Sequence, residues 1–241
     1  MAEIKGELLY GAHAVAEALK AKKRKLIAIY TTKPEPKSFL RVKQFLPASK
    51  NFNLQYVSRD VLAKMAGGSD HMGIVAWFSE FQYRKKFFEP EKHKKLLLLD
   101  GVQDVRNLGA ITRSAYCTGF DGLILCASKS AAITPSAVKA SAGLVEHLDV
   151  FLAPNTSAAL DLLNSAGYNK YFAVLGEGKL ISEVKFENPF CLIIGNEEQG
   201  VGKQHFNKGT LVTLPQKTKD ISYNASVAAG IFMFYCSFIN K

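Results

Sequence analysis

The sequence lacks a long apolar run, and no stretch approaches the roughly 18 to 20 apolar residues that a membrane-spanning helix needs. The first 20 residues also lack the basic and then apolar pattern of a secretory signal. The composition is ordinary for a globular protein, and 241 residues are enough for one or two cores. We therefore expect a cytoplasmic protein with no membrane partner.

Cysteine pairs are also lacking, since the four cysteines lie far apart without a C-x-x-C motif. Each has apolar neighbours in sequence, so we expect reduced, buried thiols and neither a disulfide framework nor a zinc site. The five histidines show no metal-ligand spacing, so we expect no metal. These residues are Cys117, Cys126, Cys191 and Cys236, with His13, His71, His93, His147 and His205.

A third absence concerns the nucleotide-binding signature G-x-G-x-x-G, which follows the first expected strand in neither half of the chain. This counts against a nicotinamide-dependent dehydrogenase. The stretch 96-LLLLDGVQDVRNLGAITR-113 nevertheless has the strand, loop and helix order of a nucleotide-binding protein. Its loop presents an asparagine and an arginine in place of glycines.

Positive charge is abundant but unevenly distributed. Residues 1–95 carry 19 lysines and arginines against 9 acidic residues, whereas residues 96–241 carry 12 of each. This asymmetry favours a first half that binds a polyanion such as nucleic acid. A lysine-rich surface that only keeps the protein in solution is the alternative.

Residues 1–80 predict a small α/β domain, followed by a linker or tethered arm at 81–95. Helices are expected at 11–25, 38–46 and 59–67, and strands at 26–32, 53–58 and 73–81. In the first helix, Ala14, Val15, Ala18 and Leu19 would point inward. The linker mixes charges with a proline and has no clean period.

Residues 96–241 predict a second α/β domain. Strands are expected at 96–99, 123–126, 148–153, 171–176, 191–195 and 210–215, and helices from near Asn107, at Thr134-Pro135, near Thr156 and over 224–238. Short apolar strands alternating with helices predict a parallel sheet covered on both faces. Ligands of such sheets bind beyond the carboxyl ends of the strands.

Three polar clusters follow expected strands, at 104–113, 195–202 and 215–226. Taken singly, each has a structural explanation. Asn107 and Asn224 would be helix N-caps, Glu197 a surface carboxylate and Arg113 a solvated helix residue. Three clusters at strand ends of one domain favour a shared site.

The clusters resemble the three motifs of the SpoU/TrmH family of RNA ribose 2′-O-methyltransferases. Motif one of that family, Asn-x-Gly followed by Arg, matches Asn107-Leu108-Gly109 with Arg113. Motif two, Gly-x-Glu-x-x-Gly, matches 195-GNEEQG-200, and motif three matches Pro215 with 222-SYNAS-226. Upstream, 10-YGAHAVAEAL-19 and 71-HMGIVA-76 resemble the ends of a ribosomal-protein (L30e-like) substrate-binding domain. That domain is found in bacterial large-subunit rRNA guanosine methyltransferases.

The resemblance implies a catalytic sheet with a deep trefoil knot, which binds S-adenosylmethionine, and a homodimer whose sites are completed by the neighbouring subunit. The apolar last helix, with Ile231, Phe232, Phe234, Tyr235 and Phe238, suits an interface or, as an alternative, an internal core. Departures from the family pattern occur at Val105, Glu198, Thr218 and Tyr223. None of them removes a polar catalytic group, although Tyr223 changes an expected cofactor wall.

The resemblance also implies roles for single residues. The backbone around Gly195, Leu214, Tyr223 and Asn224 would hold the cofactor, and a side chain at Gly195 would collide with it. Asn107 and Arg113 would face the RNA. Ser222 and Asn224 would order the third loop and could bond to Arg113 or the cofactor, and Glu197 would pair with Arg113.

Arg113 has been proposed as the base in this family. A guanidinium is essentially always protonated, with a pKa above about 12, and a nearby carboxylate would oppose its deprotonation. We therefore expect Arg113 to hold a phosphate and to orient the substrate.

The basic residues of the first half would contact RNA phosphates, which gives affinity and salt dependence without sequence choice. They are Lys22, Lys23, Arg24, Lys25, Arg84, Lys85 and Lys86. The domain arrangement favours a guanosine of 23S rRNA as the target. One alternative is that the enzyme methylates a tRNA. The other is that the protein binds RNA without catalysis.

Overall fold

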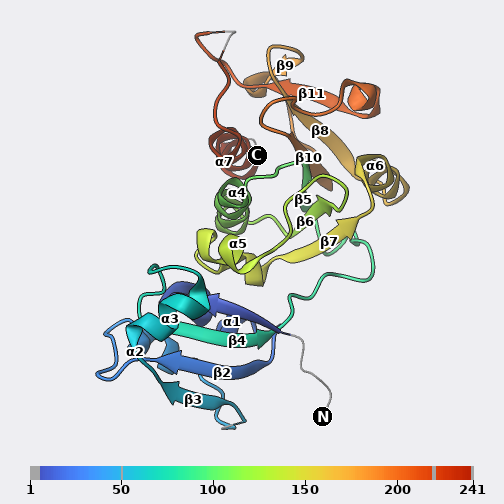
Figure 1. Cartoon of the computed structure of the whole chain (residues 1–241). Helices are drawn as coiled ribbons and strands as arrows, with labels where there is room; N and C mark the ends of the chain where they lie inside the picture. The colour runs from blue at the N-terminus through green and yellow to red at the C-terminus, as the bar shows by residue number, and fades with distance from the viewer. Residues whose placement is uncertain (1–5, 50, 219–220, 240–241) are drawn as a thin grey trace. The chain divides into compact units, whose positions relative to one another are not determined.

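The structure is a computed structural model that describes residues 6–49, 51–218 and 221–239. The chain forms two compact units (Figure 1). The first unit comprises Met1–Gln82 and Ile133–His147, and the second comprises Tyr83–Ala132 and Leu148–Lys241. The stretch 133–147 belongs to the first unit, although it lies within the expected second domain.

The first unit is built on a mixed four-stranded sheet in the order β1-β4-β2-β3. Strand β4 is antiparallel to both β1 and β2, and β3 is parallel to β2. The bounds are β1 Gly6–Tyr10, α1 Ala12–Ala21, β2 Leu26–Thr31, α2 Phe39–Lys43, β3 Asn53–Tyr56, α3 Arg59–Ala66 and β4 Ile74–Ser79. The inward residues predicted for α1 are confirmed, since Ala14, Val15, Ala18 and Leu19 are buried.

The inserted segment, residues 133–147, packs on α1 and β1 of the first unit. It contains α5 (Pro135–Ala140) and a 3-10 helix (Leu144–His147), and the predicted Thr134 cap is confirmed by its bond from the Ala137 amide. Arg24 anchors the segment: its Nε lies 3.1 Å from Glu146 Oε2, and its Nη1 lies 2.8 Å from Glu7 Oε2. The side chains of Arg24 and Glu146 are 0% and 1% exposed.

The second unit is a seven-stranded sheet in the order β7-β6-β5-β10-β8-β11-β9, and its paired strands are parallel. The predicted parallel sheet is confirmed. Its elements are β5 Lys95–Asp100, α4 Val105–Cys117, β6 Gly122–Cys126, β7 Asp149–Ala153, α6 Thr156–Ser165, β8 Asn169–Val174, β9 Lys179–Leu180, β10 Phe190–Gly195, β11 Thr210–Thr213 and α7 Ala225–Phe234. Short 3-10 helices occupy Ile181–Glu183 and Lys203–Lys208, and a π-helical turn occupies Tyr235–Ile239. Helices α4 and α7 cover one face of the sheet and α6 the other (Figure 1).

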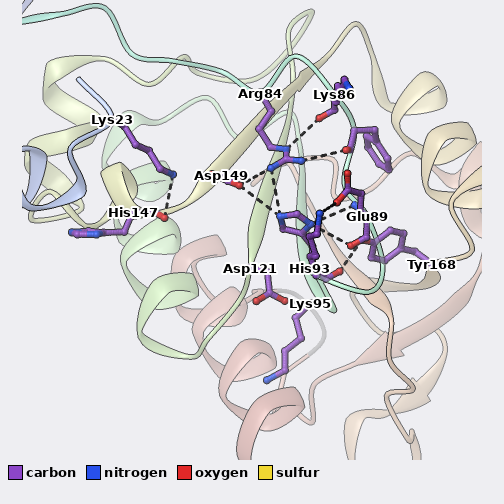
Figure 2. Close-up of polar contacts among 12 residues, drawn as sticks. Lys23, Arg84, Lys86, Glu89, His93, Lys95, Asp121, His147, Asp149 and Tyr168 are labelled. Carbon is purple, nitrogen blue, oxygen red and sulfur yellow. Dashed lines mark hydrogen bonds and ion pairs between the residues drawn. The ribbon is translucent and has the colours of Figure 1, made fainter. Parts of the chain in front are cut away.

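The stretch predicted as a linker is fixed along the edge strand β7 (Figure 2). The Arg84 amide donates to the Val150 carbonyl at 2.7 Å, and its Nη1 lies 2.6 Å from Asp149 Oδ2. Further along, the Tyr168 hydroxyl donates to the His93 carbonyl at 2.7 Å, and Phe88 is buried. These contacts make residues 84–93 a part of the second unit.

Two expectations about the second unit are wrong. Helix α4 begins at Val105, because Asp104 rather than Asn107 caps it. All four cysteines are free, but Cys117 is exposed at the end of that helix, where the amphipathic period turns it away from the sheet. In the described residues no helix has both the length and the apolar character of a membrane span.

Candidate active site

The three polar clusters meet through a chain of side-chain hydrogen bonds. Asn224 Nδ2 donates to Asn107 Oδ1 at 3.3 Å, and Asn107 Nδ2 donates to Glu197 Oε1 at 2.8 Å. These pairs join residues 117 and 90 positions apart in sequence. Each residue follows the carboxyl end of a parallel strand, which places all three at one edge of the sheet.

Two helix N-termini position the asparagines. Asn107 lies in the first turn of α4, where Asp104 accepts a bond from the Arg106 amide at 2.8 Å. That bond, reinforced by the Arg106 guanidinium, holds the pKa of Asp104 below its usual range. Asn224 caps α7 as predicted, and its Oδ1 accepts from the amide and the hydroxyl of Ser226 at 2.9 and 2.6 Å. Both asparagines are thereby fixed by backbone geometry.

Asn196 orders the loop that carries Glu197, and the sequence analysis did not single it out. Its Nδ2 donates to the Gly101 carbonyl at 2.8 Å, and its Oδ1 accepts from the Glu198 amide at 2.9 Å. Its backbone also exchanges two bonds with Gly200. An asparagine directly after an apolar strand, followed by a glycine four residues on, is a turn signal that could have identified it.

Gly195 is required by this loop itself. A Cβ at Gly195 would overlap the backbone of Gly200 and Val201. Close approach of a ligand is the expected reason for this glycine, whereas the structure shows that the backbone of the same loop already leaves no room for a side chain. Any side chain here would open the loop that carries Glu197.

Arg113 does not pair with Glu197, so that expectation is wrong. Glu197 instead accepts from Asn107 and, at 3.4 Å, from Asn196. Arg113 is exposed on α4, and within residues 6–49, 51–218 and 221–239 the structure shows no hydrogen bond or ion pair for it. Asn224 likewise bonds to Asn107 and not to Arg113. The guanidinium is thus available to a ligand.

A cavity of about 270 Å³ lies beside this network. Three of the predicted cofactor residues, Gly195, Leu214 and Tyr223, line it, as does Ser222, whereas Asn224 lies outside its wall. Apolar side chains such as Ile194 and Phe232 form much of the remainder. The Tyr223 hydroxyl donates to the Pro215 carbonyl at 3.1 Å and so closes the third loop, which gives this departure from the family pattern a structural role.

The predicted RNA-contacting residues fall into two groups. Lys22, Lys23, Lys25, Lys85 and Lys86 are exposed. Arg24 and Arg84 are held in the internal ion pairs described above, and their side chains are 0% and 22% exposed. Metal-holding groups of three His, Cys, Asp or Glu residues are not found among the described residues.

Two family profiles together match most of the chain. The profile of the SpoU rRNA Methylase family matches residues 94–234, and that of the RNA 2′-O ribose methyltransferase substrate binding domain matches residues 8–84. A 23S rRNA (guanosine-2′-O-)-methyltransferase of Blochmanniella floridana is 30% identical over 95% of this chain and 93% of its own length. A tRNA/rRNA methyltransferase of Synechocystis sp. is 31% identical over 95% of this chain, which spans 61% of that relative's length.

Solved structures show the same fold. An AdoMet-bound rRNA methyltransferase from Sinorhizobium meliloti superposes with a TM-score of 0.81, at 22% identity, over 96% of this chain and 87% of that one. At this identity the likeness is one of fold.

Proposed function

Because the chain belongs to the SpoU rRNA methylase family, we propose that it methylates the ribose 2′-hydroxyl of one guanosine in 23S rRNA, with S-adenosylmethionine as methyl donor. The observation that carries this proposal is the hydrogen-bonded chain from Asn224 through Asn107 to Glu197, beside a largely apolar cavity. The Blochmanniella relative, named for this reaction, supports the choice of RNA and base.

The lining of the 270 Å³ cavity suits the donor. The side chains of Ile194, Leu214 and Phe232 suit an adenosine, and the loop fixed by Gly195 and Asn196 presents backbone polar groups at its edge. The donor, when bound, supplies an activated methyl group on a cationic sulfur. The carboxylates of Glu197 and Glu198, which also line this cavity, favour that positive charge.

The acceptor hydroxyl would lie against Asn107 and Glu197. Glu197 is not neutralised by Arg113, so its carboxylate can accept the hydrogen bond of the 2′-hydroxyl and hold its proton as the oxygen–carbon bond forms. Asn107 fixes the orientation of Glu197 through the 2.8 Å bond. Much of the rate would come from this alignment, which can contribute several kcal/mol.

Arg113 would bind a phosphate of the RNA, since it is exposed and its fork of N–H groups matches phosphate geometry. The exposed lysines Lys22, Lys23, Lys25, Lys85 and Lys86 would add further phosphate contacts. Arg24 and Arg84 would act indirectly, by holding the segments that carry these lysines.

The trefoil knot, the homodimer and the cytoplasmic location are parts of the same proposal. Free cysteines suit a reducing compartment. On α7 and the π-helical turn, Ile231, Phe234 and Phe238 are 41%, 53% and 50% exposed, while Phe232 is buried. This apolar surface suits a second copy of the chain.

The test is a methylation assay with tritiated donor and three RNA substrates: protein-free rRNA, assembled large subunits and tRNA. The Glu197→Gln variant serves as a control that keeps the shape of the side chain but removes its charge. We expect label in rRNA with the wild type and a large loss with the variant. Label confined to tRNA would favour the alternative substrate, and no label in any RNA would contradict the proposal.

A further inference from the structure

A second cavity, of about 630 Å³, lies in the second unit and includes Asn107 and Glu197 in its wall. It shares the loop 196–200 with the 270 Å³ cavity but is much more polar in its lining. Its volume falls in the range of roughly 300 to 1,000 Å³ typical of small-molecule sites. The function proposed above leaves this cavity without a ligand.

The charges around this cavity exclude a phosphate. Four carboxylates line it, those of Asp100, Asp104, Glu197 and Glu198, against one lysine, Lys129. Because like charges repel strongly in a confined space, an anionic group would be disfavoured. Neutral groups that donate hydrogen bonds would be favoured.

Two of the four carboxylates have oxygens available to such donors. Asp100 is 8% exposed, and its Oδ1 accepts from the Thr156 hydroxyl, but no described residue donates to Oδ2. Glu198 is exposed, and its side chain makes no described hydrogen bond or ion pair. Asp104 is paired with Arg106, and Glu197, which is oriented by Asn107, already has the 2′-hydroxyl as its proposed ligand. Asp100 Oδ2 and the Glu198 carboxylate can therefore accept hydrogen bonds from a ligand in the cavity.

We propose that this cavity holds the base of the acceptor nucleotide and that its free carboxylates select guanine. The inference rests on the proposed function, because the base is attached to the sugar whose hydroxyl lies at Asn107 and Glu197. Guanine presents two adjacent donors, N1–H and the 2-amino group, which one carboxylate can bind together. Adenine and cytosine instead present a bare ring nitrogen, which a carboxylate repels.

Lys129 completes the match. Its ammonium group can only donate, and guanine carries the acceptor O6 next to N1–H. Reading of an unstacked base on its Watson–Crick edge is the usual way in which proteins choose a nucleotide in RNA.

The test compares guanosine with inosine, which keeps N1–H and O6 but lacks the 2-amino group. A short transcript around the mapped methylation site is made with either nucleoside at the target. With the wild type we expect inosine to lower kcat/KM about tenfold, the effect of one lost hydrogen bond. In Glu198→Gln the amide N–H groups would oppose the guanine donors. We therefore expect kcat/KM for the guanosine transcript to fall about tenfold and the preference for guanosine over inosine to shrink below about threefold.

The control is Glu187→Gln, an exposed glutamate of the same unit outside both cavities, which should keep the wild-type preference. An unchanged guanosine-to-inosine ratio in Glu198→Gln would overturn the inference and leave the proposed function intact. Equal wild-type rates on guanosine and adenosine transcripts would also overturn it. Absence of any ribose methylation by the wild type would instead show that the proposed function itself fails.

Discussion

Asn107 uses both ends of its side-chain amide, since it accepts from Asn224 and donates to Glu197. The Asn107→Ala variant would remove both bonds and release Glu197. We expect the single-turnover rate of methyl transfer to fall roughly 100-fold, because small misplacements of catalytic groups cost about this much. Cofactor affinity, measured by calorimetry, should change little, since Asn107 does not line the 270 Å³ cavity. Asn207→Ala, at an exposed asparagine of the same unit, is the control, and an unchanged rate in Asn107→Ala would contradict this role.

The Glu146 carboxyl makes stability depend on pH. Burial raises its pKa to about 7, more than Arg24 can offset, and the usual value is 4.5. A carboxyl whose pKa is higher in the folded state binds more protons when folded, so its contribution is full below about pH 4.5 and is lost as the pH rises through about 7. We expect Glu146→Gln to gain stability relative to the wild type over this window, by a few kcal/mol at most.

The single tryptophan, Trp77, lies in β4 of the same unit, so its fluorescence during chemical unfolding reports on this effect. Parallel pH–stability curves for the wild type and Glu146→Gln would show that the carboxyl is not perturbed. The exposed Glu80 gives a control, since Glu80→Gln should track the wild type at every pH.

At the residue level the sequence identified the polar groups of the site but not all of their partners. Asn107, Glu197 and Asn224 were found because each follows an expected strand, and the edge of a parallel sheet collects such residues. The predicted partner of Glu197, Arg113, was wrong, and Asn107 bonds to it instead. Which residue pairs with Glu197 depends on the conformation of its loop, which Asn196 sets. No periodicity encodes that bond.

The element formed by residues 84–93 is held on β7 by Arg84, whereas its neighbour Lys85 faces solvent. Arg84→Met should lower the unfolding free energy by about 2 kcal/mol, because its charge-assisted bond to Asp149 is lost. Lys85→Met should stay within about 0.5 kcal/mol of the wild type. Chemical unfolding followed by circular dichroism measures both, and equal stabilities would contradict the anchoring role.

Lys85 should contribute to RNA binding rather than to stability. Lys85→Met should weaken binding and reduce the salt slope of the association constant by about one, as expected for one lost phosphate contact. Binding titrations at several salt concentrations test this expectation. An unchanged slope would remove Lys85 from the proposed RNA surface.

Element types were largely predictable, and element partners were not. The strands of the parallel sheet were found because most of them are continuous apolar runs. Strand β1 was missed because it begins with one glycine and is followed by another, and β9 was missed because it has only two residues. The inserted segment was predicted to contain a helix at Thr134-Pro135, which is correct. Its packing on the first unit depends on the buried Arg24–Glu146 pair, which joins residues far apart in sequence.

At the scale of the whole molecule, the apolar surface of α7 and the π-helical turn predicts self-association. The rings of Phe234 and Phe238 lie 5.3 Å apart, and both are about half exposed. Phe234→Asp should yield monomers in sedimentation velocity and lose activity if the neighbouring subunit completes the site. Leu40→Asp, at an exposed leucine of the first unit, should leave the oligomer unchanged. A monomeric wild type would contradict the proposed dimer.

The central claim is that the site formed by three distant loops methylates a sugar oxygen. Alkaline hydrolysis of the labelled RNA tests it most directly, because a methylated 2′-oxygen can no longer cleave the adjacent phosphodiester. The account predicts that all of the label appears in alkali-stable dinucleotides that contain 2′-O-methylguanosine. Label released in mononucleotides would mean that a base is methylated, and this would contradict the account.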